Sequence, residues 1–312
     1  MIDAVLVLYR ATAEESESWR TLRAALENST AVRKRLRLLV YDNTPEEGGG
    51  GATERGGTAA AMGVEVAAGV EGLETGGTMP LPVRYVRDAA NGGLMAAYSR
   101  ALKEASDAEW LMLLDQDTTL TADYLREAVE LAEELAEDVS VGAIVPKLRS
   151  GGKVRSPHRA LGWAQAPLDE DFVGRAEEPV TAYNSGALLR VAALDGMGGF
   201  PAGFWLDYLD HATFAELRQA GLGVWVMETK LEHAMAWEDP EREMTVERYR
   251  GVLAAEERYH KRYGSWGSAM AFRLRMLKKA VAYAGWKDKR YARLSLKAAM
   301  GGPHRENWEP ES

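Results

Sequence analysis

The sequence predicts an α/β fold in which a mainly parallel central sheet is flanked by helices on both faces. Short apolar runs alternate along the chain with segments whose apolar residues recur at helical spacing. The run at 110–114 is apolar throughout, which is typical of a strand buried on both faces. Alternating strands and helices favour parallel pairing, because each helix carries the chain back to the start of the next strand.

The first half of the chain supplies most of the expected elements. Each expected strand is a short apolar run bounded by polar or turn-forming residues. Strands are expected at 4–9, 36–41, 82–86, 110–114 and 141–145. Helices are expected within 12–28, at 94–105 and at 122–136.

The second half is more irregular. A Gly-rich turn at 196–199 precedes an aromatic, strand-like segment at 204–208, and a helix is expected from there to about Gln219, before Gly221. A further strand is expected at 224–226, and the pattern is helical from Met244 onward. We therefore expect a catalytic domain at 1–240 and a helical extension at 241–312.

Residues 45–80 are expected to form a flexible insertion. They are rich in Gly, Ala, Thr and Glu and lack bulky apolar periodicity. The four glycines at 48–51 are not followed by the Gly-Lys-Ser/Thr of a phosphate-binding loop. No function is assigned to this segment.

Composition excludes several classes of protein. The 312 residues contain no cysteine, which excludes disulfides, thiolate metal sites and a cysteine nucleophile. No stretch approaches the roughly 20 apolar residues that span a bilayer, and the N-terminus lacks the basic region of a signal peptide. We therefore expect a cytoplasmic protein. The net charge of −9 argues against nucleic-acid binding.

Charge is distributed unevenly along the chain. Between Arg258 and Lys297 there are twelve Lys and Arg residues and a single acid, Asp288. Aromatic and aliphatic residues lie between these basic residues, as in helices that bind the inner face of a membrane peripherally. The same pattern fits a helix that packs on the catalytic domain or on a second subunit, and both interpretations stay open.

Two carboxylates follow the strand at 110–114. Asp115 and Asp117 are one residue apart at its carboxyl end, where ligands bind in open α/β sheets. At such a break both can turn toward one cation, and their hard oxygen atoms suit Mg²⁺ or Mn²⁺ shared with a diphosphate. An isolated Asp-x-Asp is more often a solvated turn, so the rest of the chain decides the interpretation.

The order of several short motifs resembles that of the family 2 glycosyltransferases, and within them a bacterial rhamnosyltransferase-like branch. The motifs run over residues 1–240. They are Val5 to Tyr9, Asp42-Asn43, Asn91-x-Gly93, Leu113 to Asp117, Asn184-Ser185-Gly186, and Trp205 to His211 followed by Arg218 and Gly221.

This resemblance implies the nucleotide-diphosphate-sugar transferase fold of the GT-A type, a divalent cation and an inverting hexosyltransferase reaction. It implies that the nucleotide-sugar is bound by Tyr9, Asp42, Asn91, Gly93 and Asp115. Asp115, Asp117 and His233 would hold Mg²⁺ or Mn²⁺. Three positions depart from the family pattern, because Arg10, Ser99 and Ala212 stand where Asn, Asn and an acid are usual.

Asp210 matches the catalytic base of the family. A base is needed because the attacking hydroxyl must lose its proton as the new bond forms. Asp207 is the competing candidate, and either aspartate could instead cap the following helix. Asp207, Trp205 and His211 are candidates for orienting the acceptor.

The sequence therefore predicts a metal-dependent glycosyltransferase of polysaccharide biosynthesis in the cell envelope. Its expected partners are a nucleotide-diphosphate sugar, with dTDP-rhamnose as one candidate, and a surface-glycan or lipid-linked acceptor, and it could form a homo-oligomer. One alternative is a non-catalytic scaffold or binding protein. The other, a sugar-nucleotide pyrophosphorylase, would need a Gly-rich, basic loop after the first strand, and residues 9–14 lack it.

Overall fold

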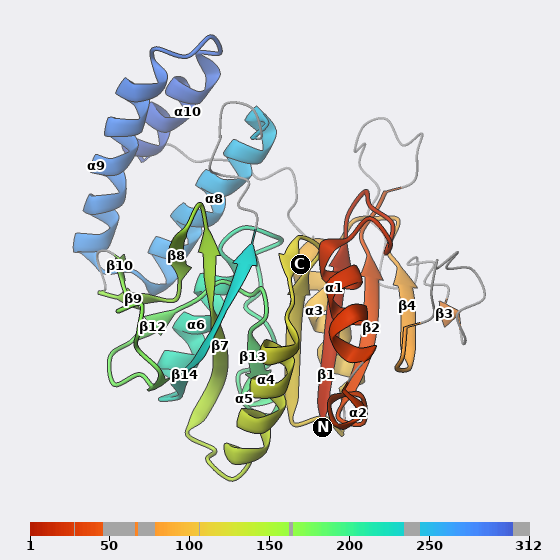
Figure 1. Ribbon diagram of the computed structural model, residues 1–312. Coiled ribbons are helices and arrows are strands. Elements are labelled where there is room, and N and C mark those ends of the chain that lie inside the picture. The colour runs from red at the N-terminus through yellow and green to blue at the C-terminus, as the bar shows by residue number, and fades with distance from the viewer. Residues whose placement is uncertain are drawn as a thin grey trace.

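The computed structural model describes residues 1–27, 29–45, 66–67, 79–105, 107–161, 165–233 and 244–301. One large sheet forms its centre (Figure 1). The strands of this sheet are β1 (Ile2–Leu8), β2 (Leu36–Asp42), β3 (Val66–Ala67), β4 (Val83–Arg87), β5 (Trp110–Asp115), β6 (Thr118–Thr119), β7 (Val141–Ser150), β8 (Lys153–Ser156), β11 (Gly174–Arg175), β13 (Leu188–Arg190) and β14 (Gly223–His233). Their order is β11-β14-β7-β13-β5-β1-β2-β4-β3, with β6 beside β14 and β8 beside β7.

Two further groups of elements complete the structure. A separate small sheet has the order β10-β9-β12 and is formed by β9 (His158–Ala160), β10 (Gln165–Pro167) and β12 (Val180–Thr181). The helices are α1 (Glu17–Glu27), α2 (Thr30–Arg33), α3 (Gly93–Glu104), α4 (Ala122–Glu134), α5 (Val191–Gly196), α6 (Leu209–Gln219), α8 (Val246–Tyr263), α9 (Trp266–Tyr283) and α10 (Arg290–Ala299).

The predicted parallel core is confirmed. Strand β1 pairs in parallel with β2 and β5, β2 pairs in parallel with β4, and β7 pairs in parallel with β14. The short strands β3, β6, β8 and β11 pair antiparallel at the margins of the sheet. Within its centre β13, which was not predicted as a strand, lies antiparallel between β5 and β7. Because β13 has only three residues, its apolar pattern is too short to separate it from the adjoining turn.

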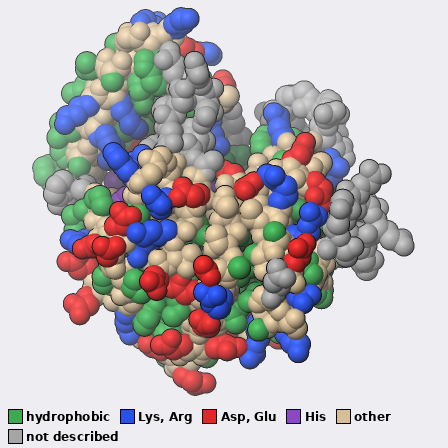
Figure 2. All heavy atoms as spheres, in the orientation of Figure 1, with side chains coloured by type: hydrophobic (Ala, Val, Ile, Leu, Met, Phe, Trp, Pro, Cys, Tyr) green, Lys and Arg blue, Asp and Glu red, His purple; other side chains and the backbone are tan. Residues whose placement is uncertain are grey.

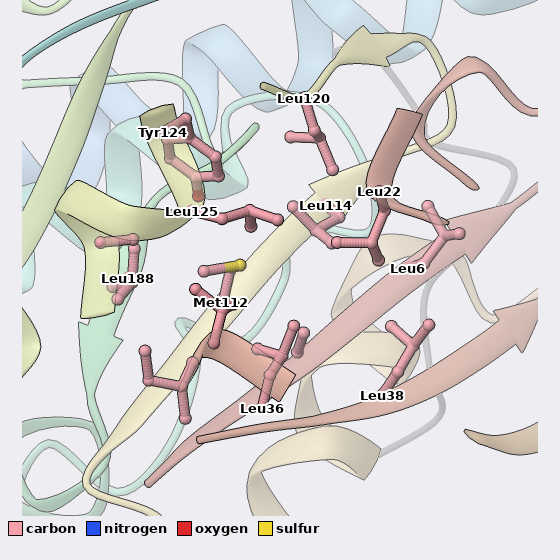
Figure 3. Close-up of a cluster of buried hydrophobic side chains, with 14 of the residues drawn as sticks. Leu6, Leu22, Leu36, Leu38, Met112, Leu114, Leu120, Tyr124, Leu125 and Leu188 are labelled. Carbon is pink, nitrogen blue, oxygen red and sulfur yellow. The ribbon is translucent and has the colours of Figure 1, made fainter. Parts of the chain in front are cut away.

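Strands β1 and β5 are buried on both faces, as their uninterrupted apolar sequences predict. Alternate side chains contribute to two different cores. On one face Leu6, Met112 and Leu114 pack with side chains from α1 and α4, including Leu22 and Leu125 (Figure 3). The opposite face carries a second core, which α3 and α6 cover. A strand enclosed in this way leaves only its ends open to polar ligands.

The remaining expectations had mixed outcomes. The segment at 204–208 is a turn rather than a strand. It directly follows Gly203, and its last residue, Tyr208, has a left-handed backbone with φ 65°. Within the expected insertion, Val66 and Ala67 pair with β4, and most of the rest lies outside the described residues. Helices α8, α9 and α10 follow β14, and α8 packs against the second core through Tyr259 and Tyr263.

Arg190, the last residue of β13, is hydrogen-bonded to the backbone between α4 and β7. Its side chain is 5% exposed, and its guanidinium lies 4.2 Å from the ring of Trp110. It donates to the carbonyl oxygens of Leu135 (2.7 Å), Asp138 (3.1 Å) and Val141 (2.8 Å). Leu135 and Asp138 follow α4 and Val141 begins β7, so Arg190 joins the end of that helix to the start of β7.

Replacing Arg190 with Met should destabilise the protein strongly, because buried carbonyl groups would lose a charged donor. Hydrogen bonds to charged groups contribute about 1.5–3 kcal/mol each, so we expect a loss of at least about 3 kcal/mol in the free energy of unfolding. Urea denaturation measures this. The control is Arg126→Met, which removes an exposed pair with Asp123 and should cost less than about 0.5 kcal/mol. Equal losses in the two variants would contradict the role of Arg190.

Candidate functional site

The candidate site lies at the carboxyl-terminal edge of the parallel strands. The register of the sheet aligns Leu8 with Asp42, Asp42 with Arg87 and Val7 with Asp115. The ends of four strands are therefore level with one another. Polar residues that follow these strands meet at one edge of the sheet, where α/β folds bind ligands.

Three of the predicted metal ligands come together at this edge. Asp115, Asp117 and His233 each offer a ligand atom, and these atoms all lie within 4.8 Å of one another. His233 ends β14 and is placed there by β6, because His233 pairs with Thr118 across the two strands. Its Nδ1 lies 2.9 Å from Thr118 Oγ1 and 3.4 Å from Asp117 Oδ1. Two carboxylates and one imidazole are a donor set that suits a divalent cation.

Asp115 is fixed by neighbours that the sequence analysis did not assign a role. Ser185 Oγ donates to its Oδ2, and the buried Tyr98 hydroxyl lies 3.5 Å from its Oδ1. Ser185 is held in turn by the Gly186 amide, which donates to Leu113 O at 2.7 Å. Asn184-Ser185-Gly186 was noted as a motif, but a motif does not show which carboxylate its hydroxyl contacts.

Asp117 is more accessible, and 46% of its side chain is exposed. Its pKa is nevertheless raised, first because the surrounding protein limits hydration of the carboxylate and second because Asp115 carries a like charge. His233 acts in the opposite direction. A bound cation would relieve the repulsion between the two carboxylates, so this arrangement fits a metal.

Tyr9 and Asp42 lie at the same edge, where Tyr9 directly follows β1 and Asp42 ends β2, on the far side of β1 from β5. The Tyr9 backbone amide donates to Gln116 Oε1 at 2.8 Å, which ties the end of β1 to the Asp115–Asp117 turn. The Tyr9 ring is 42% exposed, with the Arg10 guanidinium 5.3 Å from its centre. Asp42 is buried and accepts from the Tyr85 hydroxyl (2.5 Å) and the Thr44 amide (2.9 Å).

Asn91 and Gly93 begin α3, and both have a positive φ, 54° and 75°. The group closest to Gly93 is Trp205, because a Cβ built on Gly93 would lie 2.4 Å from the Trp205 carbonyl oxygen. The Trp205 indole donates to the Asn91 carbonyl at 3.0 Å. The space beside Gly93, where a side chain would not fit, is therefore occupied by Trp205, whereas the family resemblance implies that a ligand lies close to Gly93.

Asp88 is a further acid at this edge that the sequence analysis missed. It follows β4, is 6% exposed, and accepts from the Gly92 amide (2.8 Å), the Ala90 amide (3.0 Å) and the Tyr41 hydroxyl (3.0 Å). It shapes the turn that carries Asn91. An acid directly after a predicted strand was the signal that could have identified it.

Asp210 lies in the first turn of α6. Burial raises the pKa of the Tyr98 hydroxyl and the charges of Asp115 and Asp210 act in the same direction, so both carboxylates lie within electrostatic range of this tyrosine. Asp210 Oδ1 accepts from the His211 amide at 2.7 Å. Helix α6 has no side-chain cap, so neither Asp210 nor Asp207 fills the capping role.

Asp207 has a different partner. Its Oδ1 accepts from Arg248 Nη2 of α8 at 3.0 Å. Burial raises the pKa of Asp207, the charge of Asp210 acts in the same direction, and Arg248 opposes both. Asp207 therefore joins the catalytic domain to the helical extension.

His211 belongs to a cluster of half-buried rings beside Asp210. Its ring centre lies 5.1 Å from that of Tyr208, 6.0 Å from Tyr183 and 6.1 Å from Tyr259. Its Nδ1 is 2.9 Å from Thr181 Oγ1, which fixes the orientation of the imidazole. These rings come from the loop after β12, the turn before α6, α6 itself and α8, so no local sequence pattern predicts them.

Comparisons with known proteins agree with this architecture. A model of glycosyl transferase family 2 matches residues 67–198. Among solved structures, GalNAc-T7 with UDP, GalNAc and Mn²⁺ is similar with a TM-score of 0.56 and 11% identity, over 96% of this chain and 55% of that chain. The fold is of the GT-A type.

Other matches are more distant. S. aureus TarS gives a TM-score of 0.48 at 11% identity, over 95% of this chain and 55% of that chain. TarS 1–349 in complex with UDP gives 0.46 at 13% identity, over 97% and 93% of the two chains. This chain spans about half the length of full TarS and of GalNAc-T7. No curated protein sequence matches it significantly.

The ligand cluster predicts cation binding that depends on Asp117. Asp117→Asn should weaken Mn²⁺ affinity, measured by calorimetry, by more than the roughly 10-fold typical of losing an outer-shell partner. Affinity should also fall with pH, because protons compete for the carboxylates. Since the pKa of Asp117 is raised, this decline should begin at a higher pH than for an aspartate with the usual pKa of 3.8.

The control for this measurement is Asp195→Asn, an exposed aspartate on α5. It should leave Mn²⁺ affinity and its pH profile unchanged. Equal Mn²⁺ affinity in the native protein and in Asp117→Asn would rule out the carboxylate pair as the metal site.

Proposed function

We propose that this protein is a metal-dependent, inverting glycosyltransferase that uses a nucleotide-diphosphate sugar. The observation that carries this proposal is the cluster of Asp115, Asp117 and His233 at the strand ends, with Asp210 near the same tyrosine as Asp115. The match to glycosyl transferase family 2 and the GT-A fold support it. GalNAc-T7 was solved with a nucleotide, a sugar and Mn²⁺, which supports the same chemistry for this chain.

The donor site would lie between the metal ligands and the end of β2. Asp42 has two oxygen atoms with further acceptor capacity, and Tyr9 presents an exposed ring. Nearby, Asn43 Oδ1 and Asn184 Oδ1 are buried and have no hydrogen-bond partner in the part of the chain that the structure describes. Buried polar atoms without partners are uncommon, and a bound nucleotide-sugar would supply donors to them.

The chemistry separates into two tasks. In transfer, a bond forms between the acceptor oxygen and the anomeric carbon while the bond to the diphosphate breaks. A divalent cation held by Asp115, Asp117 and His233 would act as a Lewis acid toward the departing diphosphate. Asp210 would accept the proton of the acceptor hydroxyl at Oδ2, since Oδ1 already accepts from the His211 amide.

The acceptor would lie on the rings beside Asp210. Tyr183, Tyr208, His211 and Tyr259 are all half-buried, so each ring keeps some exposed surface. Aromatic rings of this kind combine a large apolar area with a polar atom, which suits the mixed surface of a sugar. Trp205 would act indirectly, by fixing the Asn91 turn. We propose a surface-glycan or lipid-linked acceptor at the cytoplasmic side of the cell envelope.

Asp210→Asn should reduce transfer by at least about 10²-fold, because asparagine cannot accept the proton. Donor and Mn²⁺ binding should persist, since Asp210 is not a ligand in this scheme. Asp207→Asn should be milder, because it weakens only the pair with Arg248. The melting temperature of each variant is measured beside the transfer rate. Near-normal turnover by Asp210→Asn with loss in Asp207→Asn would move the base to Asp207.

A panel of nucleotide-sugars tests the donor. The preferred donor should raise the melting temperature more with Mn²⁺ than with EDTA, because a ligand that binds only the folded state stabilises it. We expect dTDP-rhamnose to give the largest shift. Equal shifts for all nucleotide-sugars, with or without Mn²⁺, would favour a non-catalytic binding protein or scaffold.

A further inference from the structure

Helix α9 presents an apolar stripe to solvent. Five large apolar side chains are exposed along it: Trp266 (81%), Met270 (37%), Leu274 (55%), Leu277 (46%) and Val281 (73%). Their spacing of four, four, three and four residues places them on one side of a helix with 3.6 residues per turn. Scattered exposed apolar residues are normal, but an unbroken row of five is typical of a binding surface.

The opposite side of α9 already has its partners. Ser268, Phe272, Met276 and Ala280 are buried, and Phe272 and Met276 belong to a small core shared with α8 and α10. The sequence alone is compatible with a segment that packs on protein and with one that binds lipid. The structure divides its apolar residues between two faces, so packing within the chain accounts for one face only.

Basic residues flank the exposed stripe on both sides. In helical projection the exposed residues Arg273 and Lys278 lie at its two borders. Residues 266–301 contain nine Lys and Arg residues and one acid, Asp288, for a net charge of +8 in a chain of net charge −9. Figure 2 shows apolar and basic side chains side by side on these helices, whereas acidic side chains gather on the lower half of this face.

We propose that the exposed face of α9 binds the surface of an anionic phospholipid bilayer. An apolar stripe bordered by cations is the pattern of a helix that lies in the membrane interface, with its apolar side chains among the acyl chains and its cations near the phosphates. A tryptophan at one end suits the interface because its ring is apolar and its N–H is polar. In the described ranges no helix is long and apolar enough to cross a membrane.

A second copy of the chain is the competing occupant. A symmetric dimer through α9 would bring two copies of this basic segment together, and like charges close to one another oppose association. Anionic lipid instead matches both the apolar and the cationic parts of the surface. Helices α9 and α10 also project beyond the carboxyl-terminal ends of β7 and β14 (Figure 1).

Vesicle binding of the full chain tests the proposal. The native protein should sediment with phosphatidylglycerol-containing vesicles, bind pure phosphatidylcholine at least about 10-fold more weakly, and lose affinity at 1 M salt. The triple variant Leu274→Ser, Leu277→Ser, Val281→Ser should reduce binding at least about 10-fold. These side chains are exposed, so the variant should fold normally, and its melting temperature checks this.

A matched control is available on the catalytic domain. Leu161, Val173 and Val139 are 47%, 48% and 73% exposed, close to the 55%, 46% and 73% of the α9 triplet. The triple Ser variant of these three should bind vesicles as the native protein does. Because the chain has no cysteine, Leu277→Cys can carry a single environment-sensitive dye. Its emission should shift to the blue only with anionic vesicles, whereas a dye at Val139→Cys should not respond.

Three outcomes would overturn the proposal. They are no binding of the native protein to anionic vesicles, equal loss in the two triple variants, and no emission shift at position 277. A native dimer that the α9 triplet converts to a monomer, without vesicle binding, would assign the surface to a second copy. None of these measurements depends on sugar transfer, so their failure leaves the proposed enzymatic function standing.

Discussion

The structure depends on the burial of β5 on both faces. A strand that is apolar throughout must be covered by helices above and below and by strands on either side, and β1, β13, α3 and α4 provide this cover. Water and ligands then reach the strand only at its ends. Asp115, the last residue of β5, is therefore placed where a soluble ligand can meet it, and the parallel register brings Asp42 to the same edge.

Carboxylates that lie close together at this edge repel one another, and hydrogen bonds from neighbouring groups offset part of this repulsion. Asp115 accepts hydrogen bonds from the hydroxyl groups of Ser185 and Tyr98, and Asp88 accepts hydrogen bonds from backbone amides of its own turn. The pKa of Asp117 is raised, first by burial and second by the like charge of Asp115. An edge that keeps several acids close together is prepared for a positively charged ligand.

Elements with a long apolar pattern could be predicted from the sequence. Contacts between residues that are far apart in the sequence could not. The expected strand at 36–41 and helix at 122–136 correspond to β2 (Leu36–Asp42) and α4 (Ala122–Glu134). The Asp-x-Asp and His233 were identified by residue type and order, and they do come together. Trp205, by contrast, fills the space beside Gly93 although the two residues are more than a hundred positions apart in the sequence. No local sequence pattern predicts this contact. The antiparallel β13 was missed because its three residues are too few to be separated from the adjoining turn.

The Trp205 contact has a mechanical consequence. Its carbonyl accepts from the Met95 amide at 3.2 Å and its indole donates to the Asn91 carbonyl at 3.0 Å, so the beginning of α3 and the approach to α6 are joined at two points. One of these segments carries Asn91, which the family resemblance places at the nucleotide-sugar, and the other leads to Asp210. The two contacts couple these segments, so in the proposed enzyme a substitution of Trp205 would change the apparent affinities for donor and acceptor together, and not one of them alone.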